Sequence, residues 1–165
     1  MLHIGQFRSI VVRPILVLFG ELSLVLENLL VGTALTESQL VYLRSYSEGQ
    51  GIFGITEGAY VRLWRDVLLF ERTKRENLQS LSVESAGRVE DCMPSFGQVE
   101  WNLRFACAIC FLVYYQSRQF LPEEYNNVKD LAGYYRRFHN FVGGKRTVEE
   151  FMFNCRYMDG TYNKE

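Results

Sequence analysis

The chain has 165 residues, of which 48% are hydrophobic, 15% aromatic and 22% charged, and its formal net charge is −1. This composition excludes a disordered chain and is typical of a globular protein with a substantial core. The near-neutral charge provides no overall field that would attract nucleic acid or an anionic membrane, so neither is expected as a partner. One domain is expected over residues 1–165, with a loose polar tail at 158–165.

The cysteines and histidines give no sign of a metal or cofactor site. Cys107 and Cys110 have the CxxC spacing, but they lie inside the apolar stretch 105–115, with no histidine or second CxxC nearby. Burial as free thiols is therefore favoured over metal or redox chemistry, and a reducing cytoplasm is the expected place of synthesis. His3 and His139 are isolated in the sequence. No stretch has the ~20 apolar residues that a membrane span requires.

The first part of the chain is organised around one apolar helix. Short helices are predicted at 7–12 and 14–18, the second with a proline in its first turn. Ser23 then caps a helix that begins at residue 24. Residues 24–35 are apolar on every side of the helical wheel, as in a helix that other helices surround. Glu37 falls in the predicted last turn, at the boundary between this core and a cleft.

The rest of the chain contains a glycine-containing loop and further helices. The loop spans 42–56, where Gly49, Gly51 and Gly54 suit turns or a small hairpin. Helices are predicted at 57–72, 74–81, 99–116, 127–139 and 147–157, with an exposed loop at 82–94. Their predicted caps are Thr56, Ser95, Asn127 and Thr147, and Ser95 and Thr147 open capping boxes. The sequence thus predicts a mainly α fold of about seven or eight helices with at most a small β-hairpin.

Glu37 is the candidate for chemistry. The negative end of the helix dipole opposes ionisation of an acid in the last turn, and an apolar wall opposes it further, so Glu37 is expected to hold its proton near neutral pH. A general acid needs that property. The alternative is a solvated or salt-bridged helix-end residue, paired for example with Arg44.

Three segments in order carry a resemblance to a known family. Thr36-Glu37-Ser38, followed by the sequence Gly-Ile-Phe-Gly at 51–54, resembles the Glu-Ser, then Gly-x-x-Gln, pattern of the soluble lytic transglycosylase and goose-type lysozyme superfamily. Residues 13–38 are similar to small lysozyme-like proteins encoded by tailed bacteriophages, and 130–140 resembles their Tyr/Trp-Lys/Arg-Arg segment. One position departs from the pattern, because Gly54 stands where the enzymes usually carry Gln.

The resemblance implies a lysozyme-like fold and a single catalytic carboxylate, Glu37. Glu37 would protonate the oxygen that joins N-acetylmuramic acid to N-acetylglucosamine, while the acetamido group of the substrate stabilises the positive charge. Such substrate-assisted glycosidases are an exception to the two-carboxylate rule. Glu37 would then recover a proton from the muramyl 6-hydroxyl or from water.

The implied substrate-binding residues are Ser38, Gly51, Phe53, Gly54, Tyr134 and Tyr135. Tyr134 or Tyr135 occupies the place of a tyrosine that hydrogen-bonds the acid in the transglycosylases, and the sequence does not choose between them. Glu48 or Glu57 would supply a second carboxylate in a lysozyme-like hydrolysis, although a turn acid and a helix first-turn acid are their ordinary explanations.

Two hypotheses of function follow from the resemblance. The first is a muramidase or lytic transglycosylase made in the host cytoplasm and carried in the phage virion, on the tail. Its partners would be peptidoglycan glycan strands and other virion proteins, and it would need no cofactor. The alternative is a catalytically inactive structural component of the particle with a lysozyme-like fold, suggested by Gly54 and by the apolar segments 10–19 and 151–158.

Overall fold

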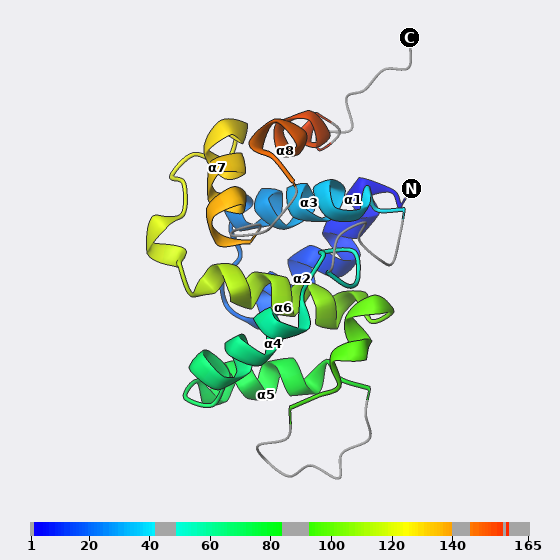
Figure 1. Ribbon diagram of the computed structural model, residues 1–165, viewed down its shortest axis with the longest axis vertical. Helices are drawn as coiled ribbons and strands as arrows, with labels where there is room; N and C mark the ends of the chain where they lie inside the picture. Colours follow the sequence, from blue (N-terminus) through cyan, green and yellow to red (C-terminus); the bar gives the residue numbers. More distant parts are fainter. Residues whose placement is uncertain (1, 42–48, 84–92, 140–145, 157, 159–165) are drawn as a thin grey trace.

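The structure is a computed structural model that describes residues 2–41, 49–83, 93–139, 146–156 and 158 (Figure 1). Helices dominate these residues, and their only β pairing is an isolated antiparallel bridge between Gln50 and Ile55. The predicted mainly α fold is therefore confirmed, while its lysozyme-like identity stays a prediction. Within the described ranges, no helix is both long and apolar enough to cross a bilayer.

The central helix is α3 (Leu24–Ser38), as the sequence predicts. The hydroxyl of Ser23 caps it by accepting a hydrogen bond of 3.2 Å from the amide of Leu26. Every residue from 26 to 38 is buried except Asn28, because helices on several sides contact α3. The helix ends where Gln39 and Leu40 adopt the left-handed conformation, with φ of 54° and 52°.

The remaining elements form layers on either side of α3 (Figure 1). On one side lie α7 (Val128–Phe138) and α8 (Val148–Cys155), which also contact each other. On the other side lies α6 (Leu103–Tyr115), followed by α4 (Glu57–Leu63), its continuation η2 (Trp64–Leu68), and α5 (Arg72–Ser80). The buried hydrophobic side chains form one contiguous cluster, which includes Cys107, Cys110 and Cys155.

The amino-terminal segment packs against α3 and forms ion pairs with it. The helical turns α1 (Ile4–Phe7), η1 (Arg8–Val12) and α2 (Arg13–Leu18) follow one another without a break. Arg8 and Arg13 each lie 2.8 Å from the carboxylate of Glu27, which is only 2% exposed. Burial opposes ionisation of Glu27, but its hydrogen bonds and the charges of the two arginines outweigh burial and lower its pKa.

The predicted caps at Thr56, Asn127 and Thr147 are confirmed, but the predicted capping box at Ser95 is wrong. Residues Phe96–Glu100 form the 3₁₀ helix η3, and α6 begins only at Leu103, where the Asn102 side chain accepts from the amide of Phe105. In a capping box, the Gln98 side chain would accept from the backbone amide of Ser95. The buried Gln98 side chain instead donates to the Ser82 hydroxyl and accepts from the Val83 amide.

Three further boundaries differ from prediction. The helix predicted at 57–72 ends at Leu68, and the next one begins at Arg72. Residue 158 is not part of a loose tail, because Met158 is 7% exposed and its amide donates to the carbonyl of Cys155. Residues 159–165 lie outside the described residues, as do Glu48, Arg44 and most of the loop predicted at 82–94.

Candidate active site

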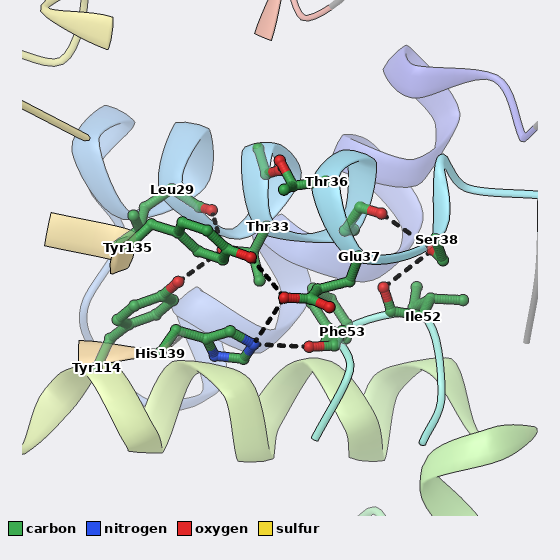
Figure 2. A network of polar contacts seen from close by, with 12 residues as sticks. Leu29, Thr33, Thr36, Glu37, Ser38, Ile52, Phe53, Tyr114, Tyr135 and His139 are labelled. Carbon is green, nitrogen blue, oxygen red and sulfur yellow. Dashed lines mark hydrogen bonds and ion pairs between the residues drawn. The ribbon is translucent and has the colours of Figure 1, made fainter. Parts of the chain in front are cut away.

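Glu37 projects from the last turn of α3 into a cluster of polar groups (Figure 2). Its neighbours come from two parts of the chain: Tyr135 and His139 lie in α7 and at its carboxyl end, and Gly54 lies in a turn. The structure does not place this acid at the predicted boundary between the core and a cleft, since Glu37 is 3% exposed. The acid is buried because helices cover one side of it and the turn covers the other.

Of the two candidate tyrosines, Tyr135 is the one that contacts the acid. Its hydroxyl donates to Glu37 Oε1 at 2.5 Å, a short hydrogen bond. Tyr134 lies about 100° further round the helix, and its hydroxyl donates instead to the carbonyl of Tyr114 at 3.1 Å. Burial, with the negative charge of Glu37, raises the pKa of Tyr135, so this phenol remains a donor at neutral pH.

His139 is the site residue that sequence reasoning missed. Its Nε2 lies 2.7 Å from the carbonyl oxygen of Phe53 and 3.9 Å from Glu37 Oε1. A carbonyl oxygen only accepts, so Nε2 carries a hydrogen. Burial lowers the pKa of His139 despite the opposite effects of Glu37 and the Phe53 carbonyl, which favours the neutral ring. A signal was present, because residues four apart on a helix share a face and Tyr135 precedes His139 by four.

The turn that covers Glu37 spans residues 50–55 and is called the glycine turn below. Gln50 and Ile55 close it with two backbone hydrogen bonds of 2.7 and 3.0 Å. Gly51 and Gly54 have φ of +69° and +60°, a region that residues with a Cβ rarely adopt. Of the turns or small hairpin predicted within 42–56, the described residues show this single bridged turn.

Gly54 packs directly on the acid. A Cβ at residue 54 would overlap Glu37 Oε2 and would lie 2.7 Å from Cδ of the same carboxyl group. The Gln of the transglycosylase pattern is therefore incompatible with this turn in its observed position. Gly51 approaches another element as closely, since a Cβ there would overlap the carbonyl oxygen of Val99 in η3.

Two other predicted site residues hold the turn in place. Ser38 is fully buried, and its Oγ lies 2.9 Å from the carbonyl oxygens of both Ala34 and Ile52, which links α3 to the turn. The Phe53 ring is also fully buried and lies 6.1 Å from the Phe7 ring. Neither side chain is exposed to a ligand in this conformation.

A second set of polar contacts lies beside the acid (Figure 2). The Thr33 hydroxyl donates to the carbonyl of Leu29 at 2.7 Å, and so the Tyr114 hydroxyl, 2.6 Å away, donates to Thr33. This pair joins α3 to α6. The ring centroid of His139 lies 5.6 Å from that of Tyr114 and 5.6 Å from that of Tyr135.

The cluster therefore contains one carboxyl group, one phenol donor and one imidazole. Among the described residues, no group of three or more His, Cys, Asp or Glu side chains is arranged to hold a metal ion. Glu57, considered as a second carboxylate, lies in the first turn of α4, where it is exposed. This set can move one proton to and from a bound molecule, which is the chemistry of a single acid/base residue.

No family model, curated protein or solved structure matches this chain. A hypothesis of function therefore depends on the geometry around Glu37 and on the residues that carry the resemblance.

Proposed function

We propose that the protein is a phage virion-associated enzyme, a muramidase or lytic transglycosylase, that cleaves the bond between N-acetylmuramic acid and N-acetylglucosamine. The supporting observation is the hydrogen bond of 2.5 Å from Tyr135 to Glu37. It joins an acid at the end of a buried helix to a tyrosine from one of the two positions where the resemblance requires one.

In the proposed reaction, Glu37 donates a proton to the bridging oxygen as the glycosidic bond breaks. The acetamido oxygen of the substrate stabilises the positive charge on the sugar carbon. The muramyl 6-hydroxyl or a water then attacks that carbon and gives its proton to Glu37, which restores the acid. Tyr135 orients the carboxyl group through its hydrogen bond to Oε1.

The burial of Glu37 adds one requirement. Because the side chain is 3% exposed and Gly54 covers it, a glycan can reach the carboxyl only if the glycine turn moves away when the glycan binds. A binding site that must rearrange in this way has a lower apparent affinity than a pre-formed site.

The test is the release of soluble muropeptides from purified peptidoglycan, together with the clearing of a turbid suspension. Wild-type protein is expected to be active and Glu37→Gln to be inactive, because the amide cannot donate an acidic proton. Glu57→Gln is the matched control, since Glu57 is an exposed acid in another helix. An inactive wild type, or a Glu37→Gln variant as active as wild type, would refute the proposal. Products that are one water lighter than hydrolysed muropeptides would identify a transglycosylase.

A second candidate is a structural component of the phage particle that has no catalytic activity. The same burial of Glu37 favours it, because a covered acid and Gly54 need not serve a substrate. Apolar side chains are also exposed in the terminal segments, namely Ile10, Val17, Met152 and Phe153. Quantitative mass spectrometry of purified particles tests this role: a fixed copy number without muropeptide release supports it, and absence from the particle excludes it.

A further inference from the structure

His139 makes contacts that the proposed reaction does not use. Its ring is buried between the Tyr114 and Tyr135 rings, and its Nε2 donates to the Phe53 carbonyl at 2.7 Å. Within the part of the chain that the structure describes, its buried Nδ1 has no hydrogen-bond partner. The tautomer with hydrogen on Nε2 explains both facts, since Nδ1 then bears only a lone pair.

We infer that His139 is a positioning residue, which holds the glycine turn against the carboxyl group of Glu37 by its hydrogen bond to Phe53. The next residue after Phe53 is Gly54, which lies so near Glu37 that a Cβ there would overlap Oε2. Any displacement of the Phe53 carbonyl therefore moves Gly54 relative to the acid.

Two side chains from different helices bind neighbouring residues of this turn. Ser38 of α3 contacts the carbonyl of Ile52, and His139, which ends α7, contacts the carbonyl of Phe53. Consecutive peptide groups are thus each bound to a separate helix. Rotation of either peptide group would leave a buried carbonyl without its donor, which is unfavourable.

A neutral His139 ring is also compatible with Glu37 as a proton donor. The titratable groups that face it are Glu37 of α3, Tyr114 of α6 and Tyr135 of α7. A positive ring 3.9 Å from Glu37 would stabilise the carboxylate and oppose donation of its proton. A neutral ring supplies the hydrogen bond to Phe53 without that effect, and burial lowers the pKa of His139 in this direction.

The inference separates into a structural part and a catalytic part, and only the catalytic part rests on the proposed function. The structural part is tested without substrate, by hydrogen exchange of the backbone amides of Gly54 and Ile55, which close the turn. His139→Leu removes the donor and His139→Gln retains an N–H near the position of Nε2. The amide of Leu78 in α5 is the reference for global stability.

In His139→Leu, the Gly54 and Ile55 amides are expected to exchange about fivefold faster than in wild type, the factor given by losing a hydrogen bond of about 1 kcal/mol. Exchange at Leu78 should stay unchanged, and His139→Gln should restore slow exchange in the turn. In wild type, a long-range ¹H–¹⁵N spectrum should show the ring of His139 with its hydrogen on Nε2. Unchanged turn exchange in His139→Leu, or a hydrogen on Nδ1 in wild type, would overturn the inference even if one variant failed to fold.

The catalytic part is measured as muropeptide release by the same variants. Because a glycan reaches Glu37 only when the glycine turn moves away, His139→Leu with its loosened turn should release muropeptides faster than wild type, and His139→Gln should return release to the wild-type rate. Release by His139→Leu at or below the wild-type rate, with a loosened turn, would overturn this role. Inactivity of every form including wild type would instead count against the proposed function, and the exchange result would stand by itself.

Discussion

Replacing Gly54 by Ala tests whether the glycine turn rests on Glu37 as tightly as the structure shows. Two costs add in this variant. A residue with a Cβ at φ of +60° is strained by about 1–2 kcal/mol, and the overlap of that Cβ with Glu37 Oε2 adds about 1–3 kcal/mol of overpacking. The free energy of unfolding should therefore fall by about 2–5 kcal/mol.

Gly20→Ala is the matched control for the first cost. Gly20 has φ of +72°, and a Cβ there would meet no atom within 4 Å, so only the strain of about 1–2 kcal/mol should remain. Urea denaturation of both variants gives the difference, which is the steric contribution of Glu37. In a Glu37→Ala background the carboxyl group is gone, and Gly54→Ala should cost no more than Gly20→Ala. Equal stability of the two alanine variants, or an unchanged cost of Gly54→Ala in the Glu37→Ala background, would refute a close contact between Gly54 and Glu37.

Three further predictions concern stability and activity. Glu27→Ala should lower the free energy of unfolding by about 3 kcal/mol, because it leaves the charges of Arg8 and Arg13 without their buried partner. Arg13→Ala should lower it less, since the Arg13 side chain is 52% exposed. Equal losses for the two variants in urea denaturation would contradict this. Because folding lowers the pKa of His139, the unfolded chain binds a proton at this residue more readily than the folded chain does. The free energy of unfolding should therefore fall as the pH drops below the usual histidine pKa near 6.5. In His139→Gln, the free energy of unfolding should change little with pH near 6.5. It should still fall below about pH 4.5, because the pKa of Glu27 is lowered in the folded chain and Glu27 gains a proton on unfolding. Tyr135→Phe should lose most muropeptide release while Tyr134→Phe retains it, because only the former hydroxyl contacts Glu37.

The fold was predictable from the sequence wherever local interactions determine it. The Ser23, Thr56 and Thr147 caps each bind an amide three residues ahead, so their signal lies within one helical turn. The Ser95 box failed because Gln98 interacts with Ser82, which is 16 residues earlier in the chain. A short motif cannot reveal such a competing tertiary contact.

The candidate site shows the same limit. The order of motifs was sufficient to single out Glu37 and to reduce its partner to two adjacent tyrosines, and the helix phase in the structure distinguishes Tyr135 from Tyr134. Burial of the acid was not predictable, since it depends on where the glycine turn lies in three dimensions. His139 was missed because its contact with Phe53 joins residues 86 apart in sequence.

The two hypotheses of function make opposite demands on the glycine turn. An enzyme requires the turn to leave Glu37 when a glycan binds, whereas a structural component requires it to stay. Addition of purified muropeptides, or of a glycan strand, to wild-type protein should therefore accelerate exchange of the Gly54 and Ile55 amides if the protein is an enzyme. Glu37→Gln serves here as the binding-competent, non-cleaving form, so that the ligand persists during the measurement. Exchange that is unaffected at saturating glycan would argue that the turn is a fixed part of the core, and it would leave the architectural role as the better account of a buried Glu37.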